Sequence, residues 1–243
     1  MFWYYDDYVN WKNNGFPIIS NVTELYISKC EIESLKGIEN LTNLEILDCS
    51  DNQLESLEGI ENLTKLEFID CENNKLKSLE SIKILINLET LNCSDNQLKS
   101  LEGLENLINL GTLYCKNNKL KSLESIKNLT KLKFLDCSDN ELQSLKCIRN
   151  LTNLELFYCG DNKLESLEGI EYLTKIEIFD CSYNNIKSLK YIHRLINLEI
   201  LFCSGNKLYS LENIKKLTKK NYIALLTICN HWKKLVICLI WKN

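Results

Sequence analysis

Apolar residues recur in a fixed pattern along most of this chain, and the pattern has a 22-residue period. One unit runs from Leu44 to Leu63. Its first part, Leu47-Asp-Cys49, alternates apolar and polar side chains as a short β-strand does. Its later apolar residues, Leu54 to Leu63, return at every third position. Period three predicts a 3₁₀ turn or a very short helix after the strand.

Two further columns keep the same period. An Asn follows each Cys of the repeat by three residues. A unit this short cannot bury enough apolar surface to fold alone, so stacked units must share one core. Strands stacked in register form a parallel sheet with a spacing of about 4.8 Å. The columns are Cys49, Cys71, Cys93, Cys115, Cys137, Cys159, Cys181 and Cys203, and Asn52, Asn74, Asn96, Asn118, Asn140, Asn162, Asn184 and Asn206.

The unit reads LxxLxCxxNxLxxLxxIxxL, which resembles the leucine-rich repeat in its 22-residue class, that of bacterial internalins and of a phosphatase regulatory subunit. Cys in place of the second strand Leu is similar to the cysteine-ladder variety of internalin-like proteins. The resemblance covers roughly residues 22 to 225. It implies an α/β fold, a right-handed solenoid with a parallel β-sheet on the concave face and 3₁₀ or short helical turns on the convex face.

Three segments follow from this pattern. Residues 22–220 form about nine repeats, of which the first is degenerate and has Cys30 at the Asn position. Residues 1–21, rich in aromatics, are interpreted as an amino-terminal cap, or else as a peptide motif that docks on an adaptor. Residues 221–243 are interpreted as a carboxy-terminal cap, with a tenth strand beginning near Ile223. The alternative for this basic tail is contact with a membrane surface.

The Cys and Asn columns have structural interpretations. A sharp turn after each strand leaves inward-facing backbone groups, which a buried Asn amide can satisfy as donor and acceptor. The Cys column is expected to be buried and reduced, because small apolar thiols suit a tight core. A ladder of disulfides or a metal site is the alternative, but no close CxxC pair is present. Cys147, Cys229 and Cys238 lie outside the column and are expected to be more reactive.

The sequence argues against several classes of protein. A net charge of −4 argues against general nucleic-acid binding. The two histidines, His193 and His231, stand in no catalytic motif, and no phosphate-binding loop or nucleophile elbow occurs. We therefore expect neither an enzyme nor a cofactor. Residues 1–20 lack the features of a signal peptide, and no apolar run reaches a membrane-spanning length, which predicts a cytoplasmic protein.

The candidate binding surface is the outer face of the strands, because residues that flank the inward Leu and Cys must point outward. These positions mix aromatic and aliphatic side chains with Asp, as protein interfaces do. The densest cluster combines Tyr114, Phe134, Asp136 and Tyr158 on adjacent repeats. The alternative is that such residues merely favour strands. The full candidate set is Phe68, Asp70, Tyr114, Phe134, Asp136, Tyr158, Asp180 and Phe202.

The predicted function is a non-catalytic protein-interaction module that binds a partner protein on its concave face. The Asp residues indicate a partner with a basic or mixed surface. Two alternatives remain open. The first is a secreted or surface adhesin of the internalin type, which would need an export signal or an anchor. The second is a structural or assembly component, which self-association would reveal.

Overall fold

The computed structural model describes residues 1–210, 224–228 and 235–239. The chain forms two compact units, Met1–Lys119 (unit 1) and Leu120–Asn243 (unit 2). Unit 1 contains α1 (Tyr5–Asn13) and strands β1 (Phe2–Trp3), β2 (Glu24–Tyr26), β3 (Ile46–Asp48), β4 (Phe68–Asp70), β5 (Thr90–Asn92) and β6 (Thr112–Tyr114). Unit 2 contains β7 (Phe134–Asp136), β8 (Leu156–Tyr158), β9 (Ile178–Asp180), β10 (Ile200–Phe202), β11 (Ala224–Ile228) and β12 (Leu235–Leu239).

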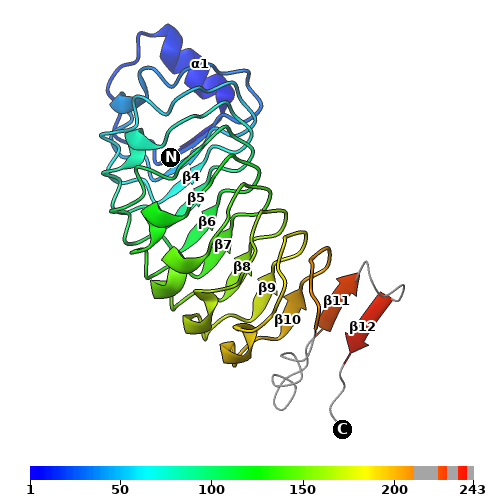
Figure 1. Ribbon diagram of the computed structural model, residues 1–243. Helices are drawn as coiled ribbons and strands as arrows, with labels where there is room; N and C mark the ends of the chain where they lie inside the picture. The colour runs from blue at the N-terminus through cyan, green and yellow to red at the C-terminus, as the bar shows by residue number, and fades with distance from the viewer. Residues whose placement is uncertain (211–223, 229–234, 240–243) are drawn as a thin grey trace. The chain divides into compact units, whose positions relative to one another are not determined.

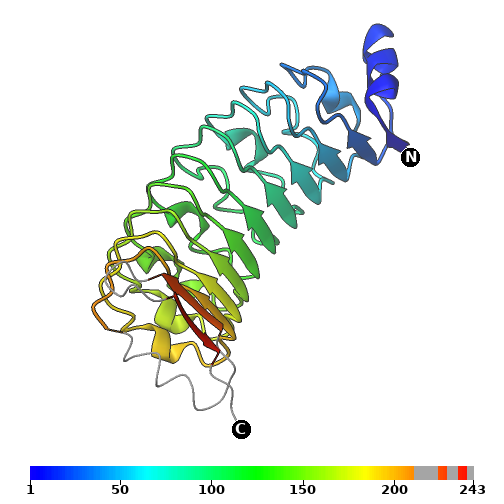
Figure 2. The ribbon, with the colours of Figure 1, turned by 90° about the vertical axis from the view of Figure 1, so that its right-hand side faces the viewer.

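Within each unit the repeats stack one on the next, with strands on one side and turns on the other (Figures 1 and 2). From β2 to β6 and from β7 to β10, each strand is parallel to its neighbour and offset from it by one repeat, as in Ile46 opposite Phe68 and Leu156 opposite Ile178. The predicted solenoid is therefore confirmed. Short 3₁₀ helices stand on the return side: η1 (Ile38–Asn40), η2 (Glu80–Ile82), η3 (Glu124–Ile126), η4 (Lys146–Asn150), η5 (Ile170–Tyr172) and η6 (Ile192–Arg194).

The core consists of the repeated apolar positions, all of them turned inward. Leu47, Cys49, Leu54 and Ile60 have no exposed surface, and their described counterparts in the later repeats are buried as well, except Leu208, which is partly exposed. Each inner repeat is stacked between two others, which cover its apolar side chains. The apolar columns therefore run without a break from one repeat to the next along the unit. Burying a Leu side chain stabilises a fold by about 1.5–3 kcal/mol, so the sum over the repeats drives the stacking.

The turn after each strand depends on the buried Asn column. Asn52 Nδ2 donates to the carbonyl oxygens of Ile27, Cys49 and Ser50 at 2.8, 3.0 and 3.0 Å. Its Oδ1 accepts from the backbone N–H of Ile32 at 2.9 Å. Ile27 and Ile32 belong to the preceding repeat, so the amide joins two repeats as well as closing its own turn. The same bonds recur at Asn74, Asn96, Asn118, Asn162 and Asn184.

The residue before each of these Asn adopts a left-handed backbone conformation, which the sequence analysis did not foresee. Asp51 has φ of 52° and Asn73 has φ of 50°. Asp and Asn tolerate this conformation better than other residues with a β-carbon. The left-handed backbone conformation therefore explains why Asp or Asn precedes the buried Asn in most repeats. Tyr183 is an exception to this preference, with φ of 52°.

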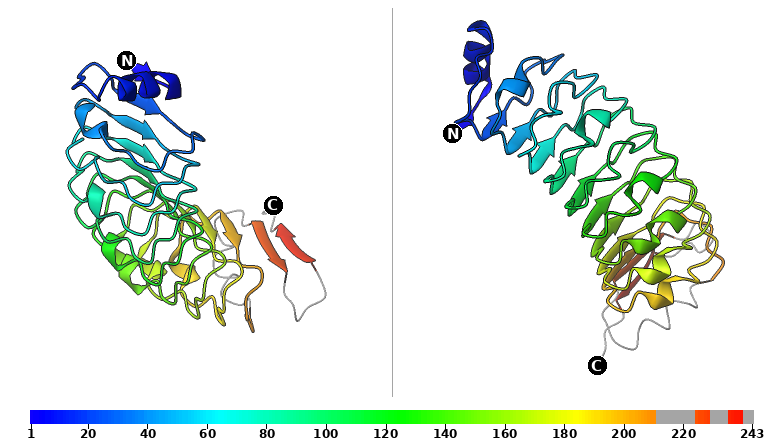
Figure 3. Two further views of the ribbon diagram at one scale, coloured as in Figure 1. Left: turned by 90° about the horizontal axis from the view of Figure 1, so that it is seen from above. Right: turned by 90° about the vertical axis from the view of Figure 1, so that its left-hand side faces the viewer.

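Residues 1–21 lie at the amino-terminal end of unit 1 (Figures 2 and 3). β1 adds a parallel strand to β2, with Phe2 opposite Glu24 and Trp3 opposite Leu25. Trp11 of α1 is buried, and its Nε1 donates to the Pro17 carbonyl oxygen at 2.8 Å. Leu25 of the first repeat is also completely buried. This burial supports a capping role for residues 1–21, which remains our interpretation.

The carboxy-terminal strands depart from the register of the repeats. β11 is parallel to β10, but Leu225 stands opposite Leu201, where the repeat would place Ile223. The tenth strand predicted near Ile223 is therefore present, but it is displaced by two positions along the chain. β12 then pairs with β11 in the antiparallel sense, so the parallel order ends there. The rest of the predicted cap, at 221–223, 229–234 and 240–243, lies outside the described residues.

Candidate interaction surface on the strand face

We call the outward side chains of β2 to β10 the strand face. In every one of these strands the middle residue is buried and its two neighbours are half-exposed. The eight predicted site residues all occupy such outward positions. Phe68 and Asp70 lie on β4, Tyr114 on β6, Phe134 and Asp136 on β7, Tyr158 on β8, Asp180 on β9 and Phe202 on β10.

In unit 2 the predicted aromatic residues come together. The rings of Phe134 and Tyr158 lie 5.7 Å apart at an interplanar angle of 39°. Asp136 stands opposite Tyr158, which stands opposite Asp180 on the next strand. Tyr158 is thus flanked by a carboxylate on each side. Phe202 continues the row beside Asp180.

In unit 1 the predicted residues lie on two separate strands. Asp70 stands opposite Asp48 on one side and Asn92 on the other. Asn92 Nδ2 donates to Asp70 Oδ2 at 3.2 Å and to Glu72 Oε2 at 2.8 Å. The pKa of the Asp70 carboxyl is raised, mainly because the group is partly buried. Tyr114 stands opposite Asn92, on the strand that follows β5.

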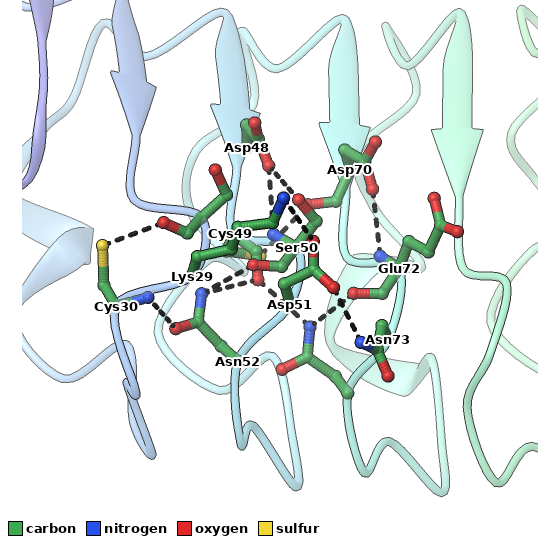
Figure 4. A network of polar contacts seen from close by, with 12 residues as sticks. Lys29, Cys30, Asp48, Cys49, Ser50, Asp51, Asn52, Asp70, Glu72 and Asn73 are labelled. Carbon is green, nitrogen blue, oxygen red and sulfur yellow. Dashed lines mark hydrogen bonds and ion pairs between the residues drawn. The ribbon is translucent and has the colours of Figure 1, made fainter.

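The Asp residues of the strand face have a structural role that the sequence analysis missed. Asp48 Oδ1 accepts from the backbone N–H of Ser50 at 3.0 Å and from its hydroxyl at 2.7 Å (Figure 4). Asp70, Asp136 and Asp180 accept in the same way from the residue two positions on, at 3.0, 3.0 and 2.8 Å. Each Asp therefore forms an Asx turn that ends its strand. The recurring Asp-Cys-Ser in the sequence is its signal.

A second acidic column was also missed. One residue before β3, β4 and β5 in unit 1 stand the exposed Glu45, Glu67 and Glu89, and Glu177 and Glu199 precede β9 and β10 in unit 2 in the same way, whereas the exposed Lys133 precedes β7. Their backbone carbonyls carry the strand pairing, as when Glu67 N–H donates to Glu45 O at 2.8 Å. The side chains stand at the edge where the strand face begins. This column makes the edge more acidic than the Asp residues alone indicated.

The chemistry of the interior is that of a scaffold. None of the ten cysteines whose side chains are described forms a disulfide, and burial raises the pKa of the Cys71 and Cys93 thiols well above the ordinary value. The Cys71 thiol donates to Asn92 O at 3.1 Å. Cys147 is half-buried, and burial raises its pKa too. The described residues contain no cluster of His, Cys, Asp or Glu suited to a metal ion.

The comparisons with known proteins agree with this architecture. The family model described as Leucine Rich repeats (2 copies) matches residues 20–62, 42–83, 86–128 and 130–172, which together exceed half of the chain. The chain belongs to the leucine-rich-repeat family. Comparison with curated proteins found no significant match in sequence. In the described part of this leucine-rich-repeat protein, no helix has the length and apolar character needed to cross a membrane.

Solved structures share the fold of this leucine-rich-repeat protein. An internalin (inlF) from Listeria monocytogenes has a TM-score of 0.66 at 22% identity, over 83% of this chain and 67% of its own. The functional domain of InlJ from the same organism, which includes a cysteine ladder, has 0.60 at 26% identity, over 84% of this chain and 47% of its own. The ectodomain of the receptor kinase GASSHO1/SCHENGEN3 from Arabidopsis thaliana has 0.65 at 19% identity, over 86% and 30%.

Proposed function

We propose that this leucine-rich-repeat protein is a non-catalytic module that binds a partner protein through its strand face. Leucine-rich-repeat folds commonly mediate protein–protein interaction, and the internalin-like neighbours are typically non-catalytic binding modules. The plant receptor ectodomain was solved in complex with Casparian strip integrity factor 2. These relatives support a protein partner, and the arrangement of side chains on the strand face supports the location.

One observation carries the proposal, and it comes from unit 2. Phe134, Leu156, Ile178 and Ile200 follow one another in register, and each is half-exposed. Tyr158 lies in the adjacent column and contacts Phe134. A continuous apolar row on a rigid sheet is an unfavourable surface to leave in water. Aromatic side chains held in this way are the usual hot spots of protein interfaces, where truncation costs about 2 kcal/mol or more.

The charge around this row favours a basic or mixed partner surface. Asp136 and Asp180 flank Tyr158, and exposed Glu177 and Glu199 stand at the edge of the same face. Each Asp already accepts a backbone hydrogen bond, so its charge is oriented by the turn. Lys or Arg of a partner would meet carboxylates that are fixed in place. Such complementarity increases the association rate and suppresses unsuitable partners.

A pull-down from the source cell, followed by affinity measurements on the partner it identifies, tests the proposal. The strand-face variant is Phe134→Ala/Tyr158→Ala, and the matched control is Tyr172→Ala/Tyr209→Ala, which removes two exposed tyrosines away from the strands. We expect the strand-face variant to bind about 30-fold more weakly or worse, with an unchanged melting temperature. If only the control loses affinity, the binding site is on the return side instead.

The internalin-type adhesin is the second candidate, and one observation favours it. The buried cysteine column matches the cysteine ladder of the InlJ functional domain, and the neighbours include internalins. The cytoplasmic location therefore remains a prediction. Protease treatment of intact cells, followed by immunodetection of the protein, separates the two candidates. Degradation on intact cells would support the adhesin, whereas protection until lysis would support an intracellular module.

A further inference from the structure

An aromatic cluster of the amino-terminal segment extends the strand face by one strand. Phe2 of β1 stands opposite Glu24, in the same outward column. The Tyr4 ring stacks on Tyr26 of β2 with a centroid distance of 5.7 Å and an interplanar angle of 27°. Phe2 meets Tyr4 edge-on at 6.1 Å. We call Phe2, Tyr4 and Tyr26 the aromatic triad.

The triad combines rigidity with unusual exposure. Phe2 and Tyr4 are 60% and 58% exposed. Phe2 is nevertheless fixed by the pairing of β1 with β2. Tyr4 is the N-cap residue of α1, where its N–H donates to Asp7 Oδ2 at 3.1 Å and its carbonyl accepts from Tyr8 N–H at 3.1 Å. Large aromatic side chains held in place and left in water lose little entropy when a ligand covers them.

Carboxylates surround the triad. The Tyr26 hydroxyl donates to Glu24 Oε2 at 2.7 Å, and this bond raises the Tyr26 pKa to about 12. The hydroxyl therefore stays protonated and holds the Glu24 carboxylate beside the rings. Asp48 stands opposite Tyr26 on β3, and the exposed Glu45 lies at the edge of that strand. The Met1 amino group, which donates to Thr23 Oγ1 at 3.3 Å, is a cation at this rim.

We propose that the aromatic triad with Glu24 is a binding site for an arginine side chain presented by an extended segment of a partner protein. The ring faces attract a cation, and the guanidinium plane can stack on Tyr4 while its N–H groups donate to Glu24. A lysine ammonium has no plane to stack and cannot form this fork of hydrogen bonds. The proposal rests on the proposed function, because it assigns one anchor point for a partner on the extended strand face.

The test uses the full-length protein and fluorescent peptides of alternating Gly and Arg, Gly and Lys, or Gly and citrulline, with anisotropy as the readout. Citrulline keeps the shape of arginine but has no charge. The triad variant is Phe2→Leu/Tyr4→Leu, which keeps apolar bulk, and the control is Tyr172→Leu/Tyr209→Leu. We expect the Arg peptide to bind wild type and control about tenfold more tightly than the triad variant. The Lys and citrulline peptides should bind more weakly than the Arg peptide.

Three results would overturn the proposal: no binding of the Arg peptide, equal binding of the Arg and Lys peptides, or equal affinity of wild type and triad variant. Because Leu could disturb β1, Tyr26→Phe serves as a second variant that keeps all three rings and releases Glu24. It should lower the affinity for the Arg peptide about threefold and leave the melting temperature unchanged. An unchanged affinity would show that Glu24 does not contribute to the site. The cellular partner, measured with Phe134→Ala/Tyr158→Ala, tests the strand-face function independently, so either proposal can fail alone.

Discussion

The inward and the outward residues of each strand differ in how much they vary from repeat to repeat, although they are direct neighbours along the chain. Inside, Cys49 and Asn52 return unchanged through eight repeats. Outside, the residue between Leu and Cys is Asp48, Asp70 and Asn92 in consecutive repeats and then Tyr114. The Cys and Asn positions must fit a fixed volume and a fixed set of hydrogen bonds. Outer positions have only to tolerate a strand and water, so their variation is available for recognition.

The first repeat explains what fixes the inner positions. Cys30 occupies the Asn position there, and Asn52 Oδ1 accepts from its backbone N–H at 3.1 Å. Every later Asn reaches back to the preceding repeat, as Asn96 does to Cys71 O at 3.0 Å. The first repeat has no preceding repeat to serve, so its Asn can be replaced. The constancy of the Asn column therefore reflects the bond between repeats more than the turn itself.

The largest effect should appear in thiol labelling. The buried thiols, such as Cys71 and Cys93, are protonated and shielded in the native protein. Labelling them requires opening of the repeats, so their rates should fall about 10³-fold or more below those of the unfolded chain. Mass spectrometry after alkylation at pH 8 checks this. Cys30 and Cys147, both half-buried, should react before any ladder cysteine. Rapid labelling of the ladder without unfolding would contradict the buried column.

Removal of one inner Asn should have the next largest effect. Asn96→Ala deletes the donors to Cys71 O, Cys93 O and Ser94 O and the acceptor for Leu76 N–H. Leaving such buried groups unsatisfied should cost about 2–4 kcal/mol of unfolding free energy. Cys30→Ala is the matched change at the equivalent position of the first repeat and should cost less than about 1 kcal/mol. Urea denaturation measures both, and equal losses would refute the argument from the first repeat.

Two glycines, Gly103 on the return side and Gly111 directly before β6, test where the backbone requires glycine. Gly103 has φ of +101°, and a β-carbon there would collide with the backbone oxygen of Leu79. Gly103→Ala should therefore cost about 1–3 kcal/mol. At Gly111 the nearest atom to a β-carbon is Glu89 O at 3.8 Å, so Gly111→Ala should be neutral or stabilise the fold by about 0.5 kcal/mol. Thermal denaturation distinguishes the two, and similar melting temperatures would show that the return side adapts to a side chain.

The 22-residue period predicted the stacked repeats because the same Cys and Asn recur at the same position of each repeat. Where this recurrence ends, the sequence no longer predicts the register of the strands. At the expected Cys and Asn positions after Cys203 and Asn206 stand Leu225 and Ile228, so no repeated marker sets the register of β11. β1 pairs through two residues only and lies before the repeats begin. On the strand face, the pattern placed Phe134 and Tyr158 on neighbouring strands, and their rings do meet. The repeat pattern of a sequence predicts which residues face outward, but it does not predict which of their rings will be in contact.

The smallest effect on stability is expected at Asp136. This position separates the structural role of the Asp, which forms the turn, from the role of its charge in binding a partner. Its Oδ1 accepts from Ser138 N–H, and Asn92 makes the same turn through its own Oδ1 at 3.1 Å to Ser94 N–H. Asp136→Asn should therefore keep the Asx turn and change stability by less than about 0.5 kcal/mol. It removes a charge, however, so a basic partner should associate more slowly and show a weaker dependence on salt.

The control at this position is Asp136→Ala, which loses both the turn and the charge and should lower stability by about 1 kcal/mol as well. Calorimetry combined with binding kinetics at two salt concentrations measures the two roles separately. If Asp136→Asn binds the partner as wild type does, the Asp residues of the strand face serve the turns alone, and recognition rests on the aromatic rows and the Glu residues at the edge.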